Sequence, residues 1–350
     1  MANLSVATKL AYRAQHLALL VNTTALQESA RVAMRQPRPK IDRSLIALLR
    51  ERRAALHATD LANVERGYYP AQLLFGFPFK DYAKQAPTLL RETPRLLQRK
   101  RAQQFRDLPA IDLTQYPHYY RRTFHWQTDG YFSERSAALY DVGVELLFRG
   151  TADVMRRQVL PPIAQHLANL MFEGQPRRGP SDVKIADIAC GTGRLLNQLA
   201  QTYPTTQLFG VDLSPYYVAH AQRQRHSRNI RIEAGNAEQL PYADASMDVL
   251  TCVYLFHELP RATRRVVLRE MLRVLQPGGL LVIEDSAQLA DSPTLAPVLE
   301  NFPVEFHEPF YREYLSDDLA AICREVGFTV ESSEPHLVAK VVVARKPLQS

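Results

Sequence analysis

The 350-residue sequence is poor in the residues that build disulfide frameworks and metal sites. It has three cysteines, Cys190, Cys252 and Cys323, which lie far apart and form neither a CxxC pair nor a mixed Cys/His ligand pattern. We therefore expect three small buried thiols in a reducing compartment, with no disulfide and no metal centre.

Long apolar runs are lacking as well. No stretch approaches the roughly 18–20 apolar residues of a membrane span, and no signal-peptide pattern starts the chain. The first acidic residue is Glu28, which gives a faint likeness to an organelle transit peptide. Serine is scarce there, however, and the helical spacing of its leucines predicts that the segment belongs to a helical array. We therefore expect a cytoplasmic protein.

The charge is distributed unevenly along the chain. Residues 1–125 contain 21 Lys and Arg against 9 Asp and Glu, a balance of +12, whereas residues 126–350 have a balance of −5. The length and the hydrophobic content of 46% are enough for two domains. We expect a basic, helical accessory or lid region over residues 1–130 and a second domain over residues 131–350.

From about residue 182 the sequence alternates between short apolar segments and amphipathic helical segments. This alternation is typical of an α/β fold with a mostly parallel sheet covered on both faces. The last two segments are close enough to form an antiparallel hairpin, so a Rossmann-like sheet of seven strands is predicted. Its strands are expected at 183–189, 207–211, 230–233, 247–254, 279–284, 329–332 and 337–344.

A glycine-containing turn follows the first of these strands. Gly191 and Gly193 lie where a ligand can approach the backbone and the start of the next helix. Leu196 stands where a dinucleotide fingerprint has its third glycine, and Asp187, just before the turn, would repel a pyrophosphate. A carboxylate at this point suits a ligand that carries a positive charge.

Polar residues also follow the second and third strands. Asp212 ends the second strand, where an acid can accept both hydroxyls of a ribose, and Leu213 can pack against a base. Asn236, followed by Ala237, comes after the third strand and can bind an adenine amino group. Several such elements in order are far more specific than a glycine turn alone.

With these residues the chain resembles the class I S-adenosylmethionine-dependent methyltransferases, and most of all the group that includes the ubiquinone/menaquinone biosynthesis C-methyltransferases. The resemblance covers roughly residues 131–345 and leaves the basic front end outside. The segments that carry it are DIACGTG (187–193), GVDLS (210–214), GNAEQLPYADASMDVL (235–250), FHEL (256–259) and REMLRVLQPGGLLVIED (269–285).

The resemblance implies S-adenosyl-L-methionine as the cofactor and a role for each matching position. Asp187, Gly191 and Gly193 would cradle the methionine part, and Asp212 would hold the ribose. The remaining implied contacts are Asn236 and Ala237 on the adenine and Tyr140 closing over the cofactor. Two residues depart from the family pattern: Ala189 replaces a glycine in the loop, and Asn236 replaces a common aspartate.

The reaction also needs a proton removed from a carbon or phenolic acceptor. Candidates follow the fourth strand: Tyr254, His257 and Glu258. His257 is the stronger candidate base because the ordinary pKa of histidine lies near neutrality, although a packed histidine that stabilises its loop explains it equally well. Glu258 precedes a helix, so capping that helix is its competing role.

Aromatic residues in two segments are candidates for binding the acceptor. Tyr311 and Tyr314 lie in the insertion after the fifth strand, and Trp126 and Tyr131 lie just before the sheet domain. They suit a flat, apolar acceptor, but ordinary packing explains both groups as well.

The basic front end has four interpretations. Its arginines at 88–106 could contact RNA phosphates, or Leu73–Phe79 could contact a membrane surface, or the arginines could be solvated or paired with acids of the sheet domain. The fourth is a role in docking another protein. We favour a methyltransferase that acts by C- or O-methylation on a small, apolar or aromatic acceptor, with peripheral membrane contact as a further expectation. A nucleic-acid-directed methyltransferase and a noncatalytic interaction protein are the alternatives, and the oligomeric state is left open.

Overall fold

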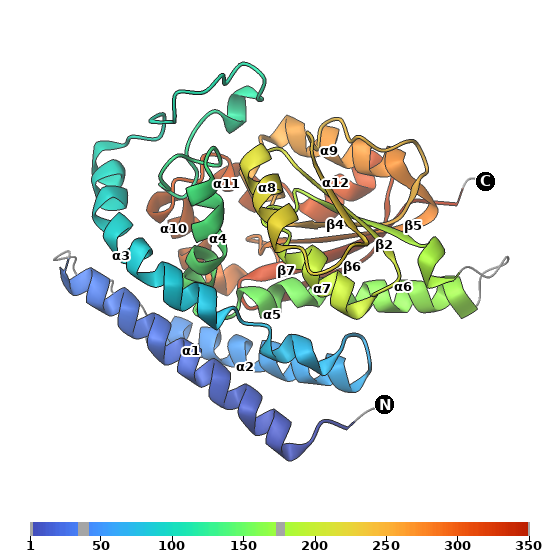
Figure 1. Cartoon of the computed structure of the whole chain (residues 1–350), viewed down its shortest axis with the longest axis horizontal. Helices are drawn as coiled ribbons and strands as arrows, with labels where there is room; N and C mark the ends of the chain where they lie inside the picture. The colour runs from blue at the N-terminus through green and yellow to red at the C-terminus, as the bar shows by residue number, and fades with distance from the viewer. Residues whose placement is uncertain (1–2, 34–41, 173–178, 349–350) are drawn as a thin grey trace. The chain divides into compact units, whose positions relative to one another are not determined.

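The computed structural model describes residues 3–33, 42–172 and 179–348 (Figure 1). The chain divides into two compact units, Met1–Met155 and Arg156–Ser350. The boundary expected between residues 130 and 131 therefore falls inside the first unit, which includes the helices that precede the sheet.

The first unit is helical, as the sequence predicts. Asp42 caps the second long helix, because its side chain accepts the backbone N–H of Ser44. No strand is formed by the described residues of this unit. Its helices are α1 (Val6–Ala33), α2 (Arg43–Glu65), η1 (Ala71–Phe75), α3 (Phe79–Ala102), η2 (His118–Tyr120), α4 (Glu134–Leu147) and α5 (Ala152–Arg156).

A buried carboxylate joins the first two helices. The hydroxyls of Tyr12 on α1 and Tyr69 both donate to Asp60 on α2, each at 2.6 Å, and Asp60 has no exposed surface. The Nδ1 atom of His57 lies 3.0 Å from the Tyr12 hydroxyl. Burial of an acid is tolerated here because both of its oxygens accept hydrogen bonds.

The arginine-rich helix α3 is bound to its own unit at several points. Arg99 donates to the carbonyl of Gln127 and to Asp107, each at 2.9 Å. Glu92, on the same helix, accepts hydrogen bonds from Thr128 and Arg135. Some of the positive charge of 88–106 is therefore engaged within the first unit, whereas the third interpretation of the front end expected acids of the sheet domain as partners.

The second unit contains one seven-stranded sheet of order β3-β2-β1-β4-β5-β7-β6. The neighbours from β3 to β5 are parallel, and β7 is antiparallel to both β5 and β6. This confirms the predicted fold class, with β7 lying between β5 and the edge strand β6. The strands are β1 (Lys184–Ile188), β2 (Gln207–Asp212), β3 (Ile230–Ala234), β4 (Met247–Val253), β5 (Leu275–Ser286), β6 (Thr329–His336) and β7 (Ala339–Arg345).

Helices connect these strands and bury them. The strands β1 and β4 are buried almost throughout, which explains their continuous apolar sequences. The helices are α6 (Leu160–Phe172), α7 (Arg194–Thr202), α8 (Pro215–Gln224), α9 (Arg261–Val274), α10 (Ala296–Glu305), α11 (Tyr311–Ser316) and α12 (Leu319–Val326). Because β1 to β5 run in parallel, the residues that follow them gather at one edge of the sheet.

Among the described residues, none of the helices is both long and apolar enough to cross a membrane.

Candidate functional site

The loop between β1 and α7 has an unusual backbone conformation. Ala189, Gly191 and Gly193 have φ angles of 57°, 53° and 76°, in the left-handed region that favours glycine. A Cβ atom added to Gly191 would meet no heavy atom within 4 Å, whereas one added to Gly193 would lie 3.1 Å from the Cβ of Ala221. Gly191 therefore faces open space, and Gly193 allows α7 and α8 to pack closely.

Asp212 at the end of β2 holds this loop in place. One of its carboxylate oxygens accepts the backbone N–H of Gly191, and the other accepts that of Ser214, each at 2.9 Å. Burial raises the pKa of Asp212 to about 6, although both backbone hydrogen bonds oppose the shift. Its side chain keeps some exposure, so the acid can still meet a ligand at the glycine turn.

Asp187 lies deeper, at the end of β1. Its carboxylate is 3% exposed and accepts a hydrogen bond from the hydroxyl of Thr251 at 2.8 Å. Burial raises its pKa to about 7, while the Thr251 hydrogen bond and the charge of Arg156 act in the opposite direction. Thr251 was not predicted from the sequence, because it becomes a neighbour of Asp187 only through the pairing of β1 with β4.

The remaining cofactor candidates divide between the units. Leu213 and Ala237 keep partial exposure beside the ends of β2 and β3. Asn236 accepts the backbone N–H of Glu238 through its Oδ1 atom at 2.9 Å, which shapes the turn after β3. Tyr140 belongs to α4 in the first unit, so its closure over the cofactor stays a prediction.

A second cluster follows β4 and β5. Tyr254 has a φ angle of 60°, and its hydroxyl donates to Glu284 at 3.2 Å. His257 lies in the short helix η5 (Phe256–Glu258), where its Nδ1 atom is 2.7 Å from Asp285. The other oxygen of Asp285 accepts the backbone N–H of Phe256 at 2.7 Å, so one buried acid orients both the loop and the imidazole.

The environment of His257 changes its protonation. Burial by itself lowers the pKa of this imidazole, but the charge of Asp285 and the hydrogen bond to it outweigh burial and raise the pKa to about 9. His257 is therefore cationic at neutral pH and cannot accept a proton there. The ordinary pKa of histidine, which favoured His257 as the base, therefore does not apply to this residue.

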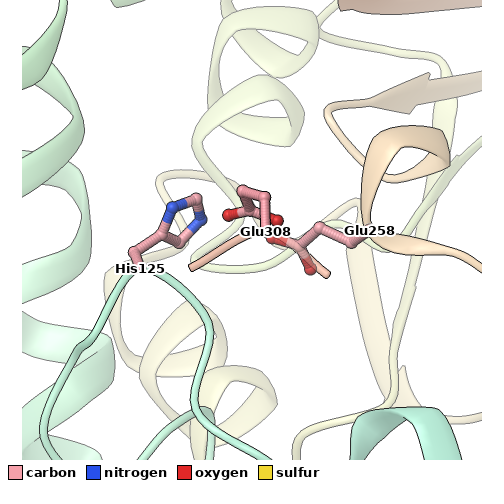
Figure 2. Close-up of side chains that lie close together, drawn as sticks. All are labelled: His125, Glu258 and Glu308. Carbon is pink, nitrogen blue, oxygen red and sulfur yellow. The ribbon is translucent and has the colours of Figure 1, made fainter. Parts of the chain in front are cut away.

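Glu258 has an acidic neighbour that the sequence did not reveal. Carboxylate oxygens of Glu258 and Glu308 lie within 4.8 Å of each other (Figure 2), and both residues are buried. The cationic His257 beside them reduces their mutual repulsion, and both acids contribute to its raised pKa. The helix α9 begins after Pro260, which offers no side-chain cap, and the capping alternative for Glu258 stays a prediction.

The tyrosines of the insertion pack beside His257. The ring centroids of Tyr311 and Tyr314 lie 5.8 and 6.3 Å from that of the imidazole, and both hydroxyls bond to Ser286. The fully buried Arg264 ties the segments together by donating to the carbonyl of Phe256 and, at 2.9 Å, to Asp317. Arg264 was not predicted, because its spacing on α9 resembles that of any solvated arginine.

Trp126 and Tyr131 lie in the first unit and are both buried. Tyr131 stacks on Tyr120 and Phe124 at ring-centroid distances of 5.6 and 5.7 Å, and Trp126 has a φ angle of 58°. The packing alternative thus has direct contacts in its favour, and a role in acceptor binding stays a prediction for both residues.

The residues at the ends of β1, β2 and β3 fit S-adenosylmethionine. Gly191 leaves space at the turn, Asp212 offers carboxylate oxygens suited to a ribose diol, and Asp187 places an acid near a ligand that carries positive charge. A ligand cation close to Asp187 would lower the pKa of this acid and favour its ionised form.

The raised pKa of His257 has a measurable consequence. Because the folded pKa of about 9 exceeds the ordinary value of 6.5, protonation of His257 stabilises the fold below about pH 6.5, and this contribution is lost as the pH rises through 9. In Asp285→Asn the burial, Glu308 and Glu258 remain and the largest raising influence is removed, so we expect the pKa to fall well below 9. Histidine-labelled NMR titration measures both values.

The variant His257→Gln assigns the resonance in that titration. A midpoint at or below 6.5 in the unmodified protein would show that the pairing with Asp285 does not hold His257 in its cationic form.

Comparison with known proteins identifies the same part of the chain. Residues 185–279 match a family model described as a methyltransferase domain. The chain is 37% identical over 102 residues to the demethylmenaquinone methyltransferase of Deinococcus radiodurans, covering 29% of this chain and 42% of that protein. It is 28% identical to a ubiquinone/menaquinone biosynthesis C-methyltransferase of Desulfotalea psychrophila, over 56% of this chain and 79% of that protein.

A third relative is an O-methyltransferase of Penicillium expansum, 32% identical over 42% of this chain and 52% of that protein. Most of the curated relatives that the chain matches are covered over less than two thirds of their own length. The family match includes the loop of Asp187, Gly191 and Asp212 described above, so this part of the chain is a methyltransferase domain, and the chain is similar to the group that includes the ubiquinone/menaquinone biosynthesis C-methyltransferases.

Proposed function

We propose that the protein transfers a methyl group from S-adenosylmethionine to a small, apolar or aromatic acceptor. The observation that carries this proposal is the arrangement at the β1 and β2 ends: Asp212 fixes the backbone of Gly191 and Ser214, and Gly191 borders open space. A noncatalytic scaffold would not need a carboxylate to be kept partly exposed at this turn.

Each cofactor-binding residue then has a physical task. Asp212 accepts hydrogen bonds from the ribose hydroxyls, Asn236 and Ala237 meet the adenine, and Asp187 attracts the positively charged end of the ligand. S-adenosylmethionine, when bound, supplies an activated methyl group. Fixed positioning and exclusion of water provide most of the rate enhancement in such a transfer.

The acceptor side is assigned to Tyr254, His257 and Glu258. The cationic His257, held by Asp285, favours an acceptor that becomes negatively charged on an oxygen or carbon. Glu258, rather than His257, then takes the acceptor proton at neutral pH. The rings of Tyr311 and Tyr314 form an apolar surround for this region.

Peripheral membrane contact by the first unit is the second part of the proposal, and it would place a cytoplasmic protein near lipid-soluble acceptors. Within Leu73–Phe79, Leu73 and Leu74 are buried, but Phe75 is 40% and Phe79 is 49% exposed. Exposed phenylalanines followed by Lys80 and Lys84 are suited to an anionic lipid surface.

The variant Asp212→Asn tests cofactor binding. Its amide oxygen can still accept the N–H of Gly191, while the hydrogen bond from Ser214 and the charge that holds the ribose are lost. Hydrogen bonds to charged groups contribute roughly 1.5–3 kcal/mol, so we expect the Kd for S-adenosylmethionine to rise about 10- to 100-fold by calorimetry. The control Glu233→Gln removes an exposed acid of β3 and should bind normally. An unchanged Kd in Asp212→Asn refutes the assignment of this residue.

Transfer itself is tested with S-adenosylmethionine labelled in its methyl group and a protein-free extract that contains both small molecules and RNA. We expect label in the fraction soluble in organic solvent, and Glu258→Gln should lower turnover at least about tenfold without changing the cofactor Kd. Glu233→Gln again serves as the matched control. Label found in RNA instead would establish the nucleic-acid alternative, and cofactor binding without any transfer would favour the noncatalytic one.

Membrane contact is tested by sedimentation with vesicles of phosphatidylcholine and phosphatidylserine. We expect the unmodified chain to co-sediment with the vesicles. The double variant Phe75→Ser/Phe79→Ser should reduce the bound fraction several-fold. Val304→Ser, at a position 52% exposed on α10, is the control. Equal binding by all three proteins contradicts the proposed contact.

A further inference from the structure

Helix α1, drawn in dark blue in Figure 1, has two apolar faces, and only one of them is covered. On the inner face, Tyr12 and Leu19 are buried: Tyr12 bonds to Asp60, and Leu19 lies against Gly150. The other face is exposed, and we call it the outer stripe. Its members are Val6, Leu10, Ala14, Leu17, Val21, Ala25, Glu28 and Val32.

The outer stripe is unusually apolar for a solvent-exposed surface. Its five large aliphatic side chains are 58–75% exposed, its two alanines are exposed as well, and Glu28 is its only charged member. From Leu10 to Val32 the stripe is about 33 Å long at 1.5 Å per residue. A contiguous apolar surface of this length marks an interaction site in a soluble protein.

The spacing within the stripe is that of a helix–helix seam. Its members recur at intervals of three and four residues, which keeps them on one side of a helix and is typical of knobs-into-holes packing. From Leu10 to Val32 the successive intervals are 4, 3, 4, 4, 3 and 4, a pattern that reads the same in both directions about Val21.

This symmetry makes the stripe complementary to itself. If two copies of α1 cross antiparallel with their two-fold axis at Val21, each Leu17 meets an Ala25, each Leu10 meets a Val32, and each Glu28 meets an Ala14. The large side chains then face small or branched ones, as close packing of two helices requires.

The charges agree with the same arrangement. Arg13, exposed next to Ala14, would reach Glu28 of the other copy, and Glu28 already pairs with Arg31 of its own helix at 2.8 Å. A carboxylate can accept from two guanidinium groups. A parallel pairing would instead bring the two Glu28 side chains together and leave Arg13 beside Arg13.

We propose that the outer stripe of α1 binds the outer stripe of a second copy of this chain, forming an antiparallel, two-fold symmetric helix pair centred on Val21. A lipid surface fits the stripe less well, because Glu28 would be buried in the apolar region and the stripe contains neither the aromatic nor the lysine residues typical of interfacial helices. An isologous contact of this type is the commonest form of protein self-association.

Sedimentation velocity of the full chain measures this association. We expect the dimer fraction to rise with protein concentration, and Val21→Asp to raise the dimer Kd at least about tenfold, because two carboxylates would face each other at the axis. Since Val21 is 59% exposed, this variant should keep the circular dichroism and melting temperature of the unmodified chain. Val304→Asp, 52% exposed on α10, should dimerise normally.

Cysteine cross-linking determines the direction of the pairing. On mild oxidation Val21→Cys should form a covalent dimer, Leu10→Cys alone should not, and a mixture of Leu10→Cys with Val32→Cys should form a mixed dimer. The native cysteines Cys190, Cys252 and Cys323 are buried and do not interfere. Val304→Cys gives the background level of cross-linking.

Four results would overturn the proposal. The first is that the chain stays monomeric at every concentration, and the second is that Val21→Asp does not weaken the dimer. The third is that Leu10→Cys cross-links to itself as readily as Val21→Cys does. The fourth is that the chain is a monomer and that Val21→Asp abolishes its binding to phosphatidylserine vesicles. The last result would assign the stripe to a membrane.

Discussion

Carboxylates at one edge of the sheet, Asp285 fully buried and Asp212 partly exposed, determine the arrangement of the site. An acid withdrawn from water needs hydrogen-bond donors, and here these donors belong largely to the loops that form the site. Asp212 takes the backbone N–H groups of Gly191 and Ser214, and Asp285 takes those of Phe256 and Ser286. Each acid therefore stabilises the loop beside it, and the parallel sheet brings these loops together.

The same acids determine the protonation of the groups around them. Asp285 keeps His257 cationic, and His257 in turn allows Glu258 and Glu308 to lie close to each other. A cation among acids favours an acceptor that becomes negatively charged during methyl transfer. The methyltransferase-domain match covers residues 185–279, and this charge arrangement is the feature that bears on the proposed class of acceptor.

The first unit has paired arginines and exposed apolar side chains, which its net positive charge alone would not indicate. Part of the positive charge on α3 is engaged with Glu92 and with the backbone of Gln127, which weakens the case for a continuous phosphate-binding surface. Among the described residues, its exposed large apolar side chains include the outer stripe of α1, Phe75 and Phe79, and Leu90 on α3. The proposed self-association and the proposed lipid contact therefore involve separate surfaces of one unit, and the variants that test them are separate as well.

The sequence by itself determined the order of strands and helices, the glycine turn and the acids that follow β1 and β2, because each depends on spacing along a short stretch of chain. Only the tertiary structure decided what depends on distant residues. The pKa of His257 depends on Asp285, 28 residues away, and the partner of Asp187 is Thr251 on another strand. Helical periodicity predicted α1 but could not distinguish its buried face from its exposed one, since both are apolar. Burial and electrostatic interaction depend on three-dimensional proximity, which local sequence patterns do not specify.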